Sequence, residues 1–388
     1  MRKRLFIVFI SAVLFFSSAS LAISLESKTR DELYRQVQLF SDALAVIETD
    51  YVEEVKAKDL IYGALKGMLS SLDPHSQFMD SDTYNELKVD TEGKFGGLGI
   101  EISLKDGQLT IITPLEDTPA WRAGLRPGDR IVKINDVLTR GMDLTGATKK
   151  LRGKPGEAVT LGILREPAQK ILEFKIVRDM IKINDIKETK VLTDGIGYIR
   201  IVEFRENTPK DFKAALQRLS RSKLVALILD LRNNPGGLLE SALEIAGEFI
   251  PEGKLIAYTQ GRKANQNMRF ISKARRPILD LPLVVLINEG SASGSEIIAG
   301  ALQDYKRATI LGVKSFGKGS VQTVIPLSDG SALRLTTSKY FTPSGKEIHG
   351  QGVTPDIVLA VTPQENSGQK LWDYKTDPQV LAAINFLK

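Results

Sequence analysis

The second half of the chain alternates apolar runs with glycine-rich loops and helix-like stretches. Three runs are typical of buried strands: residues 197–201, 224–230 and 283–287. The second run leads into Arg-Asn-Asn-Pro-Gly-Gly at 232–237, and the third leads into a serine-rich turn and a helix-like stretch at 296–304. Strand–loop–helix units of this kind build a mostly parallel sheet with its site at the carboxyl ends of the strands. The pattern therefore predicts an α/β core over residues 179–360.

The region before this core, residues 23–92, is expected to be helical. Apolar residues recur at three- and four-residue steps from Leu33 through Phe40 to Ile47, and a second stripe follows from Leu60 to Met68. We expect the first stripe to pack against the core, with a second subunit as the alternative. Leu-Asp-Pro-His-Ser at 72–76 then breaks the helix at its proline.

A small β-rich domain is predicted over residues 93–178. Runs at 100–104 and 109–112 alternate around an Asp-Gly turn, which indicates a hairpin. A short helix at 145–151 and a strand at 158–164 complete the pattern. The remaining 361–388 reads as a polar linker followed by a short terminal helix.

The N-terminus has the pattern of an export signal. Met-Arg-Lys-Arg precedes an apolar run at 5–16, and small residues end at Ala22. The run is shorter than the ~20 residues of a spanning helix, so we favour a cleaved signal peptide over residues 1–22. An uncleaved anchor in the inner membrane is the alternative. With no cysteine in the chain, disulfides and a lipoprotein anchor are excluded, and a bacterial periplasmic location is predicted.

Composition is that of a folded protein with two or three domains. The chain has 388 residues, of which 42% are hydrophobic and 26% charged. The net charge of +6 is mild, and Lys/Arg blocks interleaved with aromatic residues are absent, so nucleic acid is not an expected partner.

The segment 290–296, Gly-Ser-Ala-Ser-Gly-Ser-Glu, lies between a predicted strand and a predicted helix. A hydroxyl there would sit beside N–H groups of the helix N-terminus, which suits a nucleophile with its oxyanion hole. Ser295 precedes Glu296 and is a candidate helix N-cap. The alternative is that all three serines are turn and capping residues.

A serine nucleophile needs a base, and His75 and His349 both lie far from this segment in the sequence. The remaining candidate is Lys318 in Phe-Gly-Lys-Gly-Ser-Val-Gln at 316–322. Burial among Phe316 and the glycines would disfavour its charge and lower its pKa. A surface lysine in a glycine turn is the alternative. Residues 312–318 match the first seven positions of the phosphate-binding pattern G-x-x-x-x-G-K-[ST]. A phosphate-binding loop is nevertheless not expected, because the eighth position is Gly319 rather than Ser or Thr and a strand follows instead of a helix.

The glycine-rich loop at 230–237 leaves a strand and could present a free N–H to an oxyanion. A nucleophile, an amine base and two donor loops from separate segments suit acyl transfer. The sequence contains no metal-binding motif, so neither a metal nor another cofactor is expected.

Taken together, these residues resemble the carboxy-terminal processing, or tail-specific, serine proteases of bacteria and chloroplasts. The shared motifs are Leu-Asp-Pro-His-Ser at 72–76, Gly-Gly-Leu-Gly-Ile at 96–100, Asp-Leu-Arg-Asn-Asn-Pro-Gly-Gly at 230–237, Gly-Ser-Ala-Ser at 290–293, Phe-Gly-Lys-Gly at 316–319, Val-Gln at 321–322 and Phe-Thr-Pro-Ser-Gly at 341–345. The resemblance covers nearly everything from Tyr34 to Leu359.

The resemblance implies a multi-domain α/β fold with a helical N-terminal region, a PDZ domain and a mostly parallel catalytic core. It implies that Ser293 is the nucleophile, Lys318 the general base and Gln322 the residue that orients the lysine. The oxyanion donors would be the amides of Gly237 and Gly294. The family usually has alanine after the nucleophile, so Gly294 departs from the pattern.

For the PDZ domain, the resemblance implies that polypeptide C-termini bind as an added strand. The implied carboxylate-binding loop consists of Gly97, Leu98, Gly99 and Ile100. Arg152 aligns with an arginine that couples the PDZ domain to the protease core in some relatives, and a surface role is the alternative. Protein substrates, an activating adaptor and a second copy bound through the N-terminal helices are the implied partners.

Two other classes of protein fit these motifs less well. A non-catalytic PDZ scaffold would keep the peptide-binding loop but tolerate loss of Ser293, Lys318 and Gln322. A penicillin-binding hydrolase would need Ser-x-x-Lys and Lys-Thr-Gly, which are absent.

Overall fold

The computed structural model describes residues 31–166, 170–275, 277, 278, 280–360 and 373–388. The predicted signal peptide at 1–22 and the predicted linker at 361–370 lie outside the described residues. Within these ranges, none of the helices has the length and apolar character needed to span a bilayer.

The C-terminal half is built around a six-stranded sheet with the order β10-β11-β12-β15-β16-β19. Its strands are β10 (Ile186–Val191), β11 (Ile196–Ile201), β12 (Ala226–Asp230), β15 (Leu283–Ile287), β16 (Thr309–Gly312) and β19 (Ile357–Val358). All neighbouring strands pair in parallel except β10 and β11. The predicted mostly parallel core is therefore confirmed.

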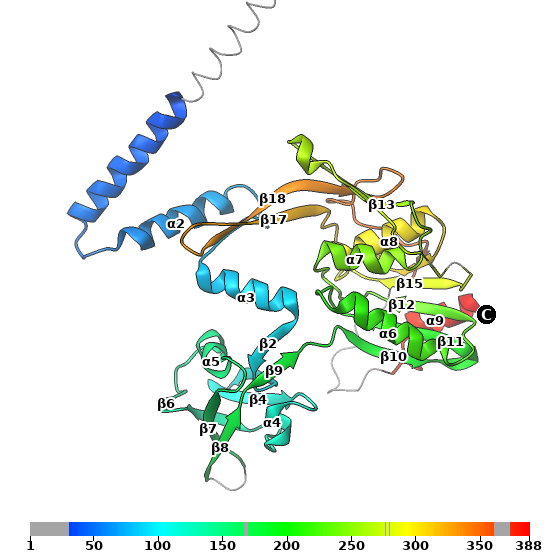
Figure 1. The fold of residues 1–388 in the computed structure, drawn as a ribbon, viewed down its shortest axis with the longest axis horizontal. Helices are drawn as coiled ribbons and strands as arrows, with labels where there is room; N and C mark the ends of the chain where they lie inside the picture. The colour runs from blue at the N-terminus through cyan, green and yellow to red at the C-terminus, as the bar shows by residue number, and fades with distance from the viewer. Residues whose placement is uncertain (1–30, 167–169, 276, 279, 361–372) are drawn as a thin grey trace, which may run out of the picture.

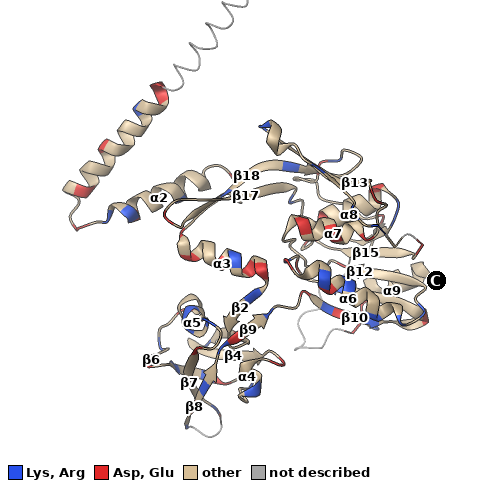
Figure 2. Cartoon of the chain, viewed as in Figure 1, with Lys and Arg blue, Asp and Glu red and all other residues tan. Residues whose placement is uncertain are grey.

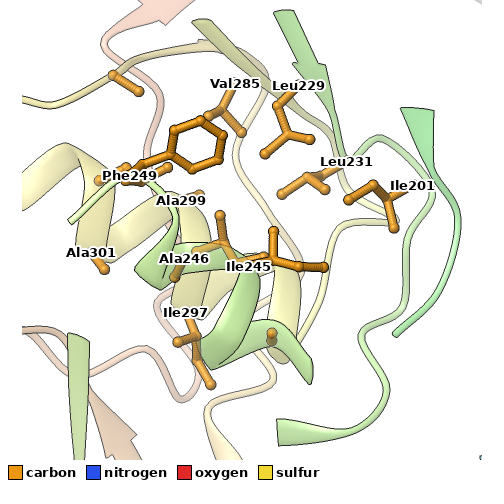
Figure 3. Close-up of a cluster of buried hydrophobic side chains, with 14 of the residues drawn as sticks. Ile201, Leu229, Leu231, Ile245, Ala246, Phe249, Val285, Ile297, Ala299 and Ala301 are labelled. Carbon is orange, nitrogen blue, oxygen red and sulfur yellow. The ribbon is translucent and has the colours of Figure 1, made fainter. Parts of the chain in front are cut away.

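Helices cover both faces of this sheet (Figure 1). They are α6 (Thr208–Ser220), α7 (Leu239–Gly247) and α8 (Gly294–Asp304) on one face and α9 (Pro378–Leu387) on the other. Side chains alternate along a strand, so Leu229 and Val285 face the first layer, whereas Ile228 faces α9. Figure 3 shows Leu229 and Val285 in one cluster with Ile245 of α7 and Ile297 of α8. This packing fixes where the loops after β12 and β15 leave the sheet.

A second sheet has the order β1-β18-β13-β14, and β17 also pairs with β18. Its strands are β1 (Gln77–Met79), β13 (Leu255–Gly261), β14 (Arg269–Ile271), β17 (Ser320–Pro326) and β18 (Ala332–Phe341), and the two short 3-10 helices of the core are Thr193–Gly195 and Ala264–Gln266. The hairpin of β17 and β18 reaches out from the core to the N-terminal region (Figure 1). There β1 pairs with β18, and the Tyr62 hydroxyl donates to Asp329 at 2.7 Å.

Residues 31–50 are helical and are followed by α2 (Ala57–Ser70) and α3 (Ser81–Glu92). The first helix stands clear of the other elements (Figure 1), and its stripe from Leu33 to Ile47 is exposed, with Leu33 at 63% and Phe40 at 44%. The prediction that this stripe packs against the core was therefore wrong. Helical periodicity shows that an apolar face exists but does not say what covers it.

The predicted PDZ domain is a β-rich unit at the end of α3 (Figure 1). Its elements are β2 (Lys94–Gly97), β3 (Ile100–Lys105), β4 (Gln108–Pro114), α4 (Pro119–Arg122), β5 (Arg130–Ile134), β6 (Val137–Leu138), α5 (Leu144–Leu151), β7 (Ala158–Leu164), β8 (Ile171–Val177) and β9 (Asp179–Lys182). The predicted β3–β4 hairpin is present. It belongs to a sheet with the order β3-β4-β5-β7-β8, in which β3 is an edge strand. Charged residues of both signs occur along this unit and along α3 (Figure 2).

Candidate active site

Three serines lie in the turn between β15 and α8, and their surroundings differ. Ser291 and Ser295 are fully buried, and their hydroxyls donate to the carbonyl oxygens of Leu231 (2.8 Å) and Asn234 (3.0 Å). Ser293 is partly exposed. Of the three, Ser293 is therefore the one that a substrate can approach.

Ser293 has a backbone conformation that side chains rarely adopt, with φ 51° and ψ −109°. It is also the N-cap of α8, so the predicted N-cap role of Ser295 was wrong: Ser295 is the second residue of the helix. A strained strand-to-helix turn of this kind holds a nucleophilic hydroxyl at the carboxyl end of a sheet. The first N–H of α8, that of Gly294, lies directly beside it.

A buried carboxylate joins the serine turn to the lysine loop. Glu296 is fully buried, and its Oε2 accepts the N–H of Ser293 at 2.8 Å and the N–H of Lys318 at 2.9 Å. Its Oε1 accepts the Ser315 hydroxyl and the Gly317 N–H, each at 2.6 Å. Four donors thus hold the turn that carries Ser293 and the loop that carries Lys318 at a fixed spacing.

Sequence reasoning did not assign Glu296 this role. The signal available was a Ser-x-x-Glu capping box, in which the Glu side chain accepts the N-cap N–H. The local pattern explains the bond to Ser293, but the bonds to the Lys318 loop come from residues far along the chain.

Lys318 is half-buried in the loop before β17. Burial lowers the pKa of its ammonium group, and the positive charge of Arg334 on β18 lowers it further, while Glu296 acts in the opposite direction. Phe316 contributes little to this burial because its side chain is 63% exposed, so that part of the prediction was wrong.

Gln322 lies on β17, close to a bulge between Val321 and Gln322. Its Nε2 donates to the Ser320 hydroxyl at 2.9 Å and to the Thr336 hydroxyl at 3.5 Å. Among the described residues, the hydrogen bonds found for this side chain do not include one to Lys318.

The glycine loop after β12 packs directly against the serine turn. A Cβ added to Gly236 would lie 2.7 Å from the Ser293 Cβ and 3.0 Å from the Gly294 nitrogen. A Cβ on Gly237 would lie 2.1 Å from the Phe204 carbonyl oxygen, and its φ of 137° also requires glycine. Both glycines are therefore dictated by close backbone approach at this site.

The motif at 72–76 also comes to this site. Asp73 accepts N–H groups of His75 and Ser76 at 2.7 and 2.8 Å, and the Thr336 hydroxyl donates to Asp73 at 3.2 Å. Burial lowers the pKa of His75, and the nearby positive charge of Lys318 lowers it further. His75 is thus brought close to Lys318 by pairing of β1 with β18, which its sequence position did not reveal.

The predicted carboxylate-binding loop lies at the start of β3. Leu98 is buried in the core of the β-rich unit, and Ile100 begins the edge strand. Helix α5 packs next to β3, as a peptide groove between strand and helix would require. Arg152 follows α5, with its guanidinium 4.5 Å from the centre of the Phe95 ring and 3.9 Å from Asp90. The structure thus places Arg152 at the base of this unit, against the end of α3.

Among the described residues, His, Asp and Glu side chains nowhere form a group of three or more that could hold a metal ion.

The chain is similar to known proteins over most of its length. Residues 195–359 match the profile of peptidase family S41, residues 110–165 that of a PDZ domain and residues 14–83 that of the activating protease CtpB N-terminal domain. The carboxy-terminal-processing protease of Bartonella bacilliformis is 45% identical over 91% of this chain and 80% of its own length. The chain belongs to the S41 family of carboxy-terminal processing peptidases.

Two further C-terminal processing proteases are similar over most of their length. The carboxy-terminal processing protease CtpB of Bacillus subtilis is 36% identical over 87% of this chain and 71% of its own. A solved photosystem II D1 C-terminal processing protease is 29% identical, with a TM-score of 0.49 over 83% of this chain and 92% of that one. The profile matches and the Bartonella and Bacillus relatives confirm the predicted family, the serine-protease class and the presence of a PDZ domain.

Proposed function

We propose that this S41 peptidase is a periplasmic endopeptidase in which Ser293 is the nucleophile and Lys318 the general base. The observation that carries the proposal is the single Glu296 oxygen that accepts the N–H groups of both residues. Because this bridge ties the backbone of the partly exposed serine to the backbone of the half-buried lysine, it supports a catalytic pair at the carboxyl edge of the central sheet.

In the proposed reaction, the neutral Lys318 amine takes the Ser293 hydroxyl proton as the oxygen attacks the substrate carbonyl carbon. The N–H groups of Gly237 and Gly294 stabilise the oxyanion. When the C–N bond breaks, the Lys318 ammonium returns the proton to the leaving amine. Water then attacks the acyl-enzyme and loses a proton to Lys318, which passes it to the Ser293 oxygen as the ester bond breaks. The new carboxyl terminus is released, and Lys318 is neutral again.

We propose that Gln322 orients the neutral Lys318 amine in the active arrangement. In this arrangement the Gln322 side chain exchanges its bonds to Ser320 and Thr336 for one to Lys318. A carboxamide suits this role because it accepts an N–H without adding a charge that would raise the pKa of the lysine.

We propose that the PDZ domain binds protein substrates by their C-termini, as a strand added to β3 with the carboxylate at the 97–100 loop. Arg152 would then report binding to the core through Asp90.

A peptide ending in valine should bind the full chain and raise its rate of cleavage of an unstructured substrate, whereas the same peptide with an amidated C-terminus should do neither. In Arg152→Ala the peptide should still bind but stimulate less. Equal stimulation in Arg152→Ala and wild type, measured with a quenched fluorescent substrate, would exclude this route.

The exposed stripe of the first helix supports a homo-oligomer formed through the N-terminal helices. An uncovered apolar face of this size is typical of an interface. Sedimentation of the wild type is expected to give an oligomer, and the double variant Val37→Asp/Phe40→Asp is expected to give a smaller species. Lys175→Asp, at an exposed position of the PDZ domain, is the control. A monomeric wild type would contradict the proposal.

A separate activating adaptor is a further proposed partner. It is tested by mixing candidate envelope proteins with the enzyme and measuring the rate of cleavage.

The periplasmic location rests on the export signal predicted at 1–22 and on the lack of cysteine. Cell fractionation tests export, and the protein is expected in the periplasmic fraction. N-terminal sequencing of the protein from that fraction tests cleavage and is expected to start after Ala22.

A further inference from the structure

The PDZ domain joins the core through a two-stranded ribbon. Strands β2 and β9 pair antiparallel, from Lys94 opposite Lys182 to Gly97 opposite Asp179. At the core end, the N–H of Ile183 donates to the Gly93 carbonyl at 2.9 Å. The end of α3 and this ribbon therefore form the junction through which any movement of the PDZ domain reaches the core (Figure 1).

The core contacts the end of α3 through the loop at 203–207, and Lys182 of β9 also pairs with Asp211 of α6 at 2.8 Å. The Arg205 Nε donates to the Asp90 carbonyl at 2.8 Å, the Glu206 N–H to Thr91 at 3.2 Å and the Asn207 amide to Glu92 at 3.3 Å. These bonds satisfy three of the last carbonyl groups of α3.

Asp90 is contacted from both sides of the junction. Arg205 of the core binds its carbonyl oxygen, and Arg152 of the PDZ domain lies 3.9 Å from its carboxylate. Both the PDZ domain and the 203–207 loop therefore help to fix the position of α3.

The Arg205 side chain is itself firmly held. It is only 13% exposed and forms ion pairs with Asp185 and Glu203. The Thr208 hydroxyl donates to Asp185 at 2.6 Å and accepts the Arg205 N–H at 2.8 Å. A planar guanidinium with several bonds of this kind transmits a displacement better than a flexible lysine.

The residue before Arg205 contacts the proposed oxyanion hole. The Phe204 N–H donates to the Gly236 carbonyl at 2.9 Å, and the Leu238 N–H donates to the Phe204 carbonyl at 2.6 Å. Because these two bonds flank Gly237 in a parallel bridge, the Gly237 N–H faces away from Phe204. The buried Phe204 ring would also lie 3.0 Å from a Cβ on Gly294.

We propose that Arg205 is a positioning residue that relays the position of the PDZ domain to the oxyanion N–H of Gly237. The inference rests on the proposed roles of Ser293 and Gly237. A shift of the α3 end moves Arg205, and the adjacent Phe204 then changes the direction of the Gly237 N–H. Tail binding controls the rate only through its different affinity for the two positions of the junction.

The test uses Arg205→Ala and Arg205→Lys in the full chain, with Arg218→Ala on the exposed side of α6 as control. The substrate is a short internally quenched peptide with an amidated C-terminus, and the effector is a labelled peptide ending in valine. Arg205→Ala is expected to lower kcat by about 10- to 100-fold, below the loss of a whole oxyanion donor. KM and the tail-peptide Kd should stay within about twofold, and stimulation by the tail should disappear. Arg205→Lys should be intermediate and Arg218→Ala unchanged.

Wild-type kcat and stimulation in both Arg205 variants would overturn the inference. A loss of kcat that matches the loss of folded protein would also overturn it, because Arg205 would then act only in stability. If Arg205→Ala does not fold, Arg205→Lys decides by the same readouts. Ser293→Ala is assayed alongside: full activity there refutes the proposed nucleophile, whereas an inactive Ser293→Ala with normal Arg205 variants refutes the relay alone.

Discussion

Ser293→Ala and Lys318→Ala are each expected to lower the rate of peptide-bond cleavage by a factor on the order of 10⁴ or more while the protein stays folded. The two side chains act as a unit, so loss of either removes almost all of the covalent pathway. The fold should survive, because the Glu296 bonds to this site use the backbone N–H groups of residues 293 and 318.

Cleavage of an unstructured protein is measured at equal concentrations of folded enzyme, checked by circular dichroism. Lys314→Ala, an exposed lysine in the same loop, is the matched control and should retain wild-type activity. Wild-type cleavage by folded Lys318→Ala would refute the assignment of the base.

Glu296→Gln is expected to reduce kcat by a factor on the order of 100 or more and to lower Tm. A carboxamide has one acceptor oxygen, so two of the four donors would face its NH₂ group. Each unsatisfied buried donor costs about 1–3 kcal/mol, and the repulsion separates the serine turn from the lysine loop. A displacement of about 1 Å at such a site is enough for a loss of this size.

The matched control is Glu289→Gln, an exposed glutamate in the same turn. Steady-state kinetics and thermal unfolding of the two variants separate the effects. Because Glu296 opposes the lowering of the Lys318 pKa, the residual activity of Glu296→Gln should rise at lower pH than that of the wild type. Unchanged kcat and Tm in Glu296→Gln would show that the carboxylate does not hold the two loops together.

The local elements of the core could be predicted from the sequence because apolar runs and helix caps are local signals. The strand at 283–287 and the terminal helix after Asp377 are examples, and both were confirmed. The exposed stripe of the first helix was mispredicted for the reason that periodicity does not identify a partner.

The candidate site could be predicted only in part. Ser293 and Lys318 lie in recognisable glycine-rich turns, so their motifs were visible. The four-donor role of Glu296 and the closeness of His75 to Lys318 depend on pairings between distant segments, such as β1 with β18. The Ser295 cap was mispredicted because the helix starts two residues earlier than its apolar pattern.

The pH dependence of kcat/KM tests the central claim most directly, because it reports the base of the free enzyme. Burial and Arg334 lower the pKa of Lys318, so activity should rise with pH as the amine loses its proton, with a midpoint below the ~10.4 of free lysine. Since His75 has a lowered pKa and is already neutral there, His75→Ala and His349→Ala should keep this limb, provided that they fold. A limb centred near the ~6.5 of histidine that disappears in His75→Ala would assign the base to His75 and contradict the mechanism.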